Sequence, residues 1–252
     1  MLTWQTTFKP LVKRGYKSTW GLAKKLLPTS LLVRMRDQMR LVERLDYARQ
    51  PIWMYVDAQV QIGRLQACSK EPETVQWIEA NVKAGDAFYD IGANVGAYSF
   101  VADAAAGGGA TVYAFEPSFA TFSALSQNIL LNRCQGRIVP FQVALWHETK
   151  VLMLEYSDVV PGAALHHLEE QAPSDSRKPV TPILSFRLDD FIRDFGLRPP
   201  NHIKLDVDGA EVNVLRGAEQ TLADPALRSL LVEVEDTNSR EIIDFLRAKG
   251  LE

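Results

Sequence analysis

Cysteine, histidine and long apolar runs are scarce in this sequence, and each scarcity excludes a class of protein. The two cysteines, Cys68 and Cys134, are too few for a disulfide framework and are typical of a reducing compartment, so we expect a cytoplasmic protein. Neither they nor the four histidines have metal-ligand spacing, and no metal site is predicted. No run approaches the roughly 18 apolar residues of a membrane-spanning helix. The remaining composition, 46% hydrophobic and 23% charged, is that of an ordinary globular protein.

The net charge of −3 hides an asymmetry along the chain. Residues 1–49 contain 11 Lys and Arg against 3 Asp and Glu, whereas residues 50–252 contain 17 against 28. The basic segment is either a solvated helix face or a surface that docks on an anionic membrane, which would place the protein at the inner face of that membrane. Its lysines interrupt every apolar run that could form a secretory signal. The acidic body disfavours nucleic acid as a partner.

The first third of the sequence predicts helices and one short strand. Residues 1–49 indicate helical pieces broken near Gly15, Gly21 and Pro28. A helix from about Ser30 to Ala48 is predicted by apolar residues at three- and four-residue spacing: Leu31, Leu32, Met35, Met39, Val42 and Leu45. A strand at Ile52–Val56, an ambiguous stretch at 58–69 and a helix from Pro72 to near Gly85 follow. We therefore expect a basic helical extension at 1–50 and a lead-in segment at 51–85.

From residue 86 onward, apolar strand-like runs alternate with helical patterns. The expected strands are Ala87–Ile91, Thr111–Phe115, Arg137–Ala144, His202–Val207 and Ser229–Val234. The expected helices begin near Gly96, Ser118, Gly209 and Asn238. This alternation predicts a doubly wound α/β domain with a parallel sheet over 86–252. Residues 150–200 depart from it: strands at Val151–Tyr156 and Ile183–Leu188 flank a polar stretch that we expect to be a functional or mobile loop.

The strongest local motif is the glycine loop Asp90-Ile91-Gly92-Ala93-Asn94-Val95-Gly96, which follows a strand and opens a helix. Gly92 would let the backbone approach a ligand, and Gly96 would let the helix pack on the strand. The loop lacks the G-x-G-x-x-G spacing of dinucleotide sites. Asp90 disfavours a pyrophosphate and favours a cationic ligand. S-adenosylmethionine, which has an ammonium and a sulfonium group, is therefore the favoured cofactor, with S-adenosylhomocysteine as its product.

Two further groups of acidic residues follow expected strands. Glu116 comes 20 residues after Gly96, where a carboxylate can accept both hydroxyl protons of a ribose. NAD and S-adenosylmethionine sites share this feature, so Glu116 alone does not discriminate between them. Asp206, Asp208 and Glu211 gather with a lysine at the end of the strand at 202–207. Ligands in such folds bind at that edge of the sheet, near the topological switch point.

Residues 70–250 resemble the FkbM family of S-adenosylmethionine-dependent methyltransferases. The resemblance rests on six motifs in matching order and spacing: Lys70-Glu71-Pro72-Glu73-Thr74, DIGANVGAYS at 90–99, YAFEPS at 113–118, Gln127-Asn128 with Asn132, Leu188-Asp189-Asp190, and IKLDVDGAEVNVLRGAE at 203–219. Asp208 departs from the family, which usually has Glu there, and this change could alter the positioning of the acceptor. The resemblance implies a Rossmann-like class I methyltransferase fold and O-methyl transfer to hydroxyls of sugars, polyketides and related small molecules.

The resemblance also implies roles for individual residues. The methionine part of the cofactor would be lined by Asp90, Gly92, Ala93, Asn94 and Gly96, and Glu116 would hold the ribose. The adenine would be bordered by Pro117, Ser118, Ala144 and Leu145. Asp206 would face the transferred methyl group.

Removing the hydroxyl proton calls for a base, and three candidates remain open. Asp206 is the first candidate; its alternative role is that of an acid that binds the cofactor and never moves a proton. Glu211 is the second, and its alternative is a carboxylate favoured by a helix N-terminus. His166 and His167 are the third, with a solvated loop as their alternative.

The class I fold normally ends with two more strands, which this sequence lacks after residue 249. A sheet without that hairpin would expose an unpaired edge, which a second copy of the chain could cover in a homodimer. We expect an O-methyltransferase for a small-molecule or glycan hydroxyl. A degenerate S-adenosylmethionine-binding module without turnover is the alternative, motivated by the missing hairpin and by Asp208. A nicotinamide-dependent oxidoreductase is disfavoured by Asp90 and by the spacing of the glycines.

Overall fold

The computed structural model describes residues 21, 24–171, 177–234 and 238–251, and it divides the chain into two compact units, Met1–Leu41 and Val42–Glu252. In the first unit, helix α2 spans Thr29–Gln38 and none of its residues is buried. The predicted helix from Ser30 to Ala48 is therefore too long, because strand β1 spans Leu41–Arg44. Leu45 follows that strand as a fully buried core residue and donates its backbone N–H to Ile52 at 2.9 Å. The helical pieces predicted around Gly15 lie outside the described residues.

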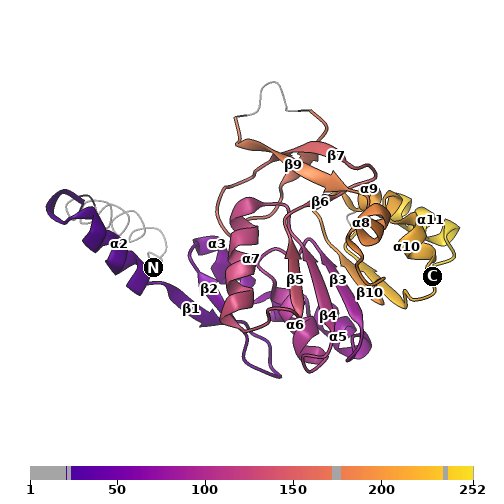
Figure 1. The fold of residues 1–252 in the computed structure, drawn as a ribbon, viewed down its shortest axis with the longest axis horizontal. Helices are drawn as coiled ribbons and strands as arrows, with labels where there is room; N and C mark the ends of the chain where they lie inside the picture. The colour runs from indigo at the N-terminus through magenta and orange to yellow at the C-terminus, as the bar shows by residue number, and fades with distance from the viewer. Residues whose placement is uncertain (1–20, 22–23, 172–176, 235–237, 252) are drawn as a thin grey trace, which may run out of the picture. The chain divides into compact units, whose positions relative to one another are not determined.

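The second unit is built on a five-stranded parallel sheet (Figure 1). Its order is β11-β10-β3-β4-β5, and every neighbouring pair is parallel. The strands are β3 (Ala87–Ile91), β4 (Thr111–Phe115), β5 (Ile138–Phe141), β10 (His202–Leu205) and β11 (Ser229–Val232). The predicted α/β class is confirmed, and β3 and β4 have the predicted bounds. Both are short, mostly apolar runs, and Gly92 follows the first and Glu116-Pro117 the second, so their ends are easy to locate in the sequence.

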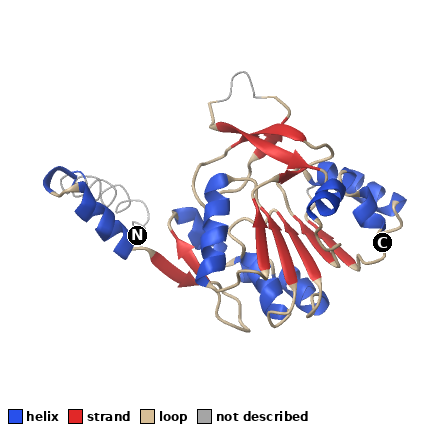
Figure 2. Cartoon of the chain, in the orientation of Figure 1, coloured by secondary structure: helices blue, strands red, loops and turns tan. Residues whose placement is uncertain are grey.

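Helices cover both faces of this sheet, as Figure 2 shows. Phe88 packs into the core beneath α5, α6 and α7, whereas its neighbours Ala87 and Tyr89 pack into the opposite core with α8, α9, α10 and α11. Alternate residues of one strand thus face opposite layers. The helices are α5 (Pro72–Asn81), α6 (Ala97–Ala105), α7 (Phe119–Leu131), α8 (Leu188–Phe195), α9 (Glu211–Arg216), α10 (Glu219–Ala223) and α11 (Ser239–Ala248). Helix α5 ends before the predicted Gly85, because the backbone of Val82 is extended.

Four strands between residues 144 and 186 form a second sheet, to which the polar stretch expected to be a loop contributes one short strand, β8. Its order is β6-β9-β7-β8, with β7 antiparallel to both β8 and β9. The strands are β6 (Ala144–Leu145), β7 (Lys150–Glu155), β8 (His167–Glu169) and β9 (Val180–Phe186). The two central strands, β7 and β9, were predicted near their observed positions, but β8 is too short and polar to give a periodic signal.

The lead-in segment packs against α7 through two asparagine side chains. Strand β2 (Trp53–Val56) precedes α3 (Gln59–Arg64) and α4 (Ala67–Lys70), which occupy the stretch that the sequence left ambiguous. The backbone N–H of Tyr55 donates to Asn128 at 2.9 Å, and that of Trp53 donates to Asn132 at 2.8 Å. Because β2 pairs with the exposed β1 alone, these amides satisfy backbone groups that would otherwise lack partners.

The strand order reverses at β3, which lies between β4 and β10. Ligands in open α/β sheets bind at such a switch point, beyond the carboxyl ends of the strands. Among the described residues, β11 is the edge strand of the parallel sheet at the end opposite β5, and β10 is its only neighbouring strand. Pairing of β11 with a second copy stays a prediction. No helix in the described part of the chain combines the length and apolarity that crossing a membrane would need.

Candidate functional site

The glycine loop after β3 brings three strands close together. The backbone N–H groups of Gly92 and Ala93 both donate to the Phe115 carbonyl of β4, at 3.0 and 2.9 Å. On the other side, a Cβ added at Gly92 would lie 1.7 Å from the carbonyl oxygen of Asp206. Gly92 also has a φ of +83°, which favours glycine. Its missing side chain therefore serves the close approach of β10, in addition to any approach of a ligand.

Gly96 serves packing between two helices. With a φ of +96°, it precedes α6, and an added Cβ would lie 2.7 Å from Leu125 of α7 and 2.9 Å from Phe100. The sequence predicted that it would allow the helix to pack on the strand. The structure places its bare backbone against α7 instead.

Glu116 follows β4 and is buried, with 6% of its surface exposed. Its two carboxylate oxygens accept the backbone N–H groups of Asn94 at 3.0 Å and Ser118 at 2.8 Å. Burial, together with the charges of Asp208 and Asp90, raises the pKa of Glu116 to about 7 against the opposing effect of these hydrogen bonds. Each oxygen retains one lone pair that can accept a further hydrogen bond, so the carboxylate can hold a pair of hydroxyls.

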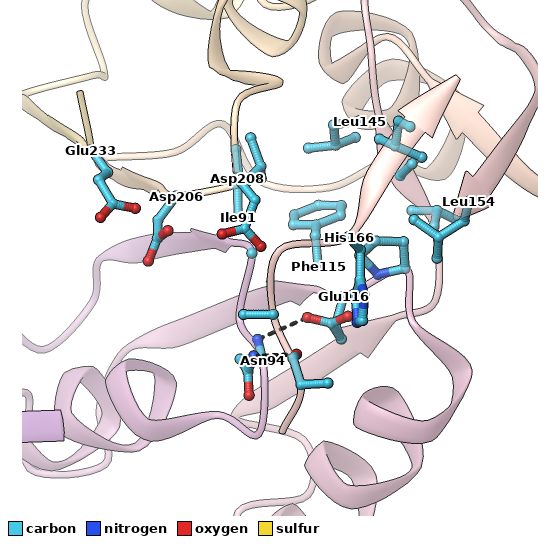
Figure 3. A pocket seen from close by; sticks show the side chains of 18 of the residues that line it. Ile91, Asn94, Phe115, Glu116, Leu145, Leu154, His166, Asp206, Asp208 and Glu233 are labelled. Atoms are coloured by element: carbon cyan, nitrogen blue, oxygen red, sulfur yellow. Dashed lines mark hydrogen bonds between the residues drawn. The ribbon is translucent and has the colours of Figure 1, made fainter. Parts of the chain in front are cut away.

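A cavity opens beyond the ends of β3, β4 and β10, where the loops of the parallel sheet meet the second sheet (Figure 3). It brings together the predicted residues Gly92, Asn94, Glu116, Pro117, Ala144, Leu145 and Asp206. Phe115, Val143, Leu154 and Leu168 add an apolar part to its lining. The sequence reasoning did not assign this apolar part, because Leu154 and Leu168 belong to the second sheet, whose position depends on pairing between distant segments.

The other residues that were predicted to bind the cofactor do not line the cavity. Ala93, Gly96 and Ser118 are buried in the loops behind it. Asp90 is fully buried beneath the glycine loop, where one carboxylate oxygen accepts the Ser99 hydroxyl at 2.6 Å. Its other oxygen lies 3.8 Å from the ammonium of Lys204 and has no hydrogen-bond partner. The negative charge of Asp90 thus faces a buried lysine, and the argument that it selects a cationic ligand by direct contact does not hold in this geometry.

Other carboxylates give the cavity a negative charge. Glu71, Glu116, Asp206, Asp208 and Glu233 line it, and Arg64 is the one Lys or Arg among the described lining residues. The guanidinium of Arg64 is engaged with the Gly162 carbonyl at 3.0 Å. Such a lining suits a cationic or polyhydroxylated ligand and disfavours a phosphate group. In the described residues, no group of His, Cys, Asp and Glu side chains is placed to hold a metal ion.

Glu211 is buried and lies outside the cavity. One of its oxygens accepts the backbone N–H groups of Val207 and Gly209 at 3.2 and 3.1 Å, and the other accepts the Asn238 amide at 3.0 Å. This carboxylate secures the turn between β10 and α9, which is its alternative role in the sequence analysis. We assign no proton transfer to it.

The segment 162–166 crosses one side of the cavity and is held by side chains from the loops that follow β3 and β10. Asp208 accepts the backbone N–H of Leu165 at 2.7 Å, and Asn94 donates to the carbonyl of Ala163 at 3.1 Å. Asp208 has a left-handed φ of +53°, and this turn directs its short side chain toward Leu165. The residue that departs from the family pattern thus holds the wall of the cavity in place.

His166 lines the cavity as a hydrogen-bond donor. The backbone N–H of Ser157 donates to its Nδ1 at 3.2 Å, so the proton of the neutral ring is on Nε2. Burial lowers the pKa of His166 and favours this neutral form. Its Nε2 is buried and has no partner. A donor N–H in this position fits a ligand acceptor atom and cannot take a proton from an acceptor hydroxyl. His167 lies in the exposed strand β8 and does not line the cavity.

Comparisons with known proteins agree with this architecture. Residues 90–251 match the family described as Methyltransferase FkbM domain. The 31-O-demethyl-FK506 methyltransferase FkbM of Streptomyces tacrolimicus is 30% identical over 198 residues, which cover 67% of this chain and 74% of the relative. The hexuronic acid methyltransferase AglP of Haloferax volcanii is 24% identical over 69% of this chain and 66% of its own length.

A solved structure shows the same fold. The methyltransferase FkbM of Methylobacillus flagellatus superposes with a TM-score of 0.50 and 15% sequence identity, over 77% of this chain and 49% of that protein. The chain thus spans between about half and three quarters of the length of the relatives that it matches.

Proposed function

The chain belongs to the FkbM methyltransferase family, and on that premise we propose that it is an S-adenosylmethionine-dependent O-methyltransferase for a hydroxyl of a sugar, a glycan or another small-molecule natural product. The observation that carries the proposal is Glu116, a buried carboxylate at the end of β4 that faces an otherwise acidic cavity at the switch point. Two relatives are named for their acceptors, 31-O-demethyl-FK506 and a hexuronic acid.

The lining residues fit the proposed cofactor by their chemistry. Glu116 would accept the two ribose hydroxyls, and Pro117, Ala144 and Leu145 offer apolar surface for the adenine. Gly92 and Asn94 would border the methionine part, whose positive charges suit the carboxylates at the other end of the cavity. When bound, the cofactor supplies a methyl group already activated on a sulfonium. The chain itself then has to align the acceptor oxygen, exclude water and remove the hydroxyl proton.

Affinity for S-adenosylhomocysteine is expected to fall as the pH falls, because the pKa of Glu116 is raised to about 7 and a protonated carboxyl accepts fewer hydrogen bonds. We expect a roughly tenfold weaker Kd at pH 6 than at pH 8, measured by titration calorimetry. The Glu116→Gln variant should show no such dependence, and a wild-type Kd that is constant over this range would contradict the assignment. In the ligand-free chain, the raised pKa makes Glu116 contribute stability that is complete below about 4.5 and lost as the pH rises through about 7.

The alternative is a module that binds S-adenosylmethionine without turnover. The departure at Asp208 motivates it, since that carboxylate is committed to the backbone of Leu165 and not to an acceptor. Methyl-labelled S-adenosylmethionine, assayed with a panel of glycosides and macrolide alcohols, separates the two. Transfer of label to an acceptor hydroxyl supports the enzyme. Tight S-adenosylhomocysteine binding with no transfer to any acceptor supports the module.

We further propose that residues 1–49 contact an anionic membrane surface from the cytoplasmic side. Helix α2 presents Leu31, Met35 and Arg34 to solvent, with no buried residue of its own. Vesicles that contain phosphatidylglycerol should bind the full chain, and binding should weaken with added salt and with the pair Arg34→Glu and Arg36→Glu. Binding to neutral phosphatidylcholine vesicles is the control. Equal binding to both vesicles, or no effect of salt, would refute membrane contact through charge.

A further inference from the structure

Two carboxyl groups end adjacent strands on the same face of the sheet. The register of β10 and β11 pairs Leu205 with Val232, so the next residues, Asp206 and Glu233, follow side by side. The backbone N–H of Glu233 donates to the Leu205 carbonyl at 2.9 Å and continues that register by one step. Both side chains line the cavity, and Figure 3 shows them next to each other at the end remote from Glu116. The carboxyl group nearest to Asp206 is thus one that the sequence reasoning did not select.

A buried lysine makes these two carboxyls unequal. The ammonium of Lys204 lies 2.8 Å from an oxygen of Asp206, and the lysine side chain is only 4% exposed. It also lies 5.0 Å from the ring centre of Tyr98 and 3.8 Å from an oxygen of Asp90 on the neighbouring strand β3. A hydrophobic pair of the same size would stabilise this core at least as well as buried charges do. The charges at this position are therefore better explained by their effect on Asp206 than by stability.

The surroundings of Asp206 and Glu233 shift the pKa values of the two carboxyls in opposite directions. Burial acts to raise the pKa of Asp206, but the Lys204 ammonium and hydrogen bonds from Lys204 and Glu233 outweigh it, and the pKa lies below its ordinary value. The hydrogen bond with Asp206 raises the pKa of Glu233, followed by burial and by the charges of Asp206 and of Glu71 at the start of α5; Lys204 opposes them. Two carboxyls whose environments push them apart in this way commonly divide the acid–base work of a site.

We propose that Glu233 is the base to which the acceptor hydroxyl donates its hydrogen bond and then its proton, while Asp206, kept ionised by Lys204, accepts the hydrogen bond of the protonated Glu233. This inference rests on the proposed methyltransferase function. As the acceptor oxygen forms its new bond to the methyl carbon, the S–CH3 electron pair leaves with sulfur. The acceptor O–H bond breaks and its proton goes to a Glu233 oxygen. The new Glu233 O–H can donate to Asp206, which stabilises the protonated product state.

Glu233 thus takes the role of base in place of Asp206, which was the first candidate from the sequence. A carboxylate that an ammonium contacts directly is a weak base, because accepting a proton would forfeit the ion pair. Glu233 has no such contact, and its raised proton affinity brings it closer to neutral pH, where general bases act efficiently. Lys204 then acts through Asp206 as a positioning residue and does not touch the acceptor.

A titration of the ligand-free full chain tests the pair without knowledge of the acceptor. With 13C-labelled side-chain carboxyls, NMR should find Glu233 titrating well above the ordinary value of about 4.3 for glutamate. The Asp206→Asn variant should return Glu233 toward that value, because its anionic neighbour is gone. Lys204→Met should raise the titration of Asp206. A Glu233 that titrates near 4.3 in the wild type, or that does not respond to Asp206→Asn, would overturn the inference.

Kinetics on whichever glycoside or macrolide alcohol the wild-type chain methylates test the step itself. Glu233→Gln should lower kcat by about 10²–10⁴-fold, remove the pH dependence of kcat that belongs to the base, and leave the Kd of S-adenosylhomocysteine within about twofold. Glu241→Gln, which changes an exposed glutamate paired with Arg216, is the matched control. Unchanged kcat in Glu233→Gln would refute the role of Glu233 alone. If the wild type binds the product but methylates nothing, the proposed enzyme fails, and the NMR titration still decides the pairing.

Discussion

Replacing Glu116 with Ala should abolish measurable binding of S-adenosylhomocysteine. The variant removes the carboxylate that would accept the two ribose hydroxyls, and hydrogen bonds to a charged group contribute about 1.5–3 kcal/mol each. We therefore expect the Kd to rise by at least about 10²-fold. The same change leaves the buried N–H groups of Asn94 and Ser118 without their acceptor, which costs about 1–3 kcal/mol for each unsatisfied group.

The conservative variant separates binding from folding in this experiment. Glu116→Gln keeps the volume and one acceptor oxygen, so its fold should survive while its Kd still rises by about tenfold or more. Glu79→Gln is the matched control, because Glu79 accepts from Tyr47 away from the cavity. Calorimetry and thermal unfolding of the three variants give both quantities. A Glu116→Gln Kd within threefold of the wild type would contradict the assigned role of Glu116.

The second large effect is expected from Gly92→Ala. The new Cβ would lie 1.7 Å from the Asp206 carbonyl oxygen, so β10 has to move, and the φ of +83° is unfavourable for alanine. We expect a loss of about 2–4 kcal/mol in the free energy of unfolding, measured with urea, together with weaker cofactor binding.

Gly85→Ala is the matched control for that variant. Gly85 has a comparable φ of +91°, but nothing lies within 4 Å of an added Cβ. Its cost should therefore be the backbone strain alone, about 1 kcal/mol. The difference between the two variants isolates the contact between β3 and β10 that places Asp206 in the cavity. Equal losses in both variants would show that this contact is unimportant.

The sequence predicted the parts of the fold that depend on local pattern. The strands β3 and β4 have the expected bounds because each is a buried run with a clear end. The prediction that the helix continues to Ala48 was wrong. Met39, Val42 and Leu45 keep a helical spacing by coincidence, but Leu45 is buried in the core after strand β1. The second sheet was missed as a sheet because its pairings join residues distant in the sequence, such as Ala144 with Ser185 and Lys150 with Ser185.

In the candidate site, too, local sequence patterns were predictable and contacts between distant segments were not. Carboxylates at strand ends could be found from the sequence, and Glu116 and Asp206 do line the cavity. Their partners could not, since the contact of Asp90 with Lys204 follows from the register of two strands more than a hundred residues apart. Glu233 obeys the rule that selected Asp206, because both are acidic residues near the end of a predicted strand, and applying that rule to every strand would have identified it.

The most direct test of this account is a calorimetric titration of the full chain with S-adenosylhomocysteine and, separately, with NAD. The acidic cavity, Glu116 and the family of the chain together predict saturable one-site binding of S-adenosylhomocysteine that Glu116→Ala removes, and no binding of NAD. Binding of NAD without binding of S-adenosylhomocysteine would contradict the central claim.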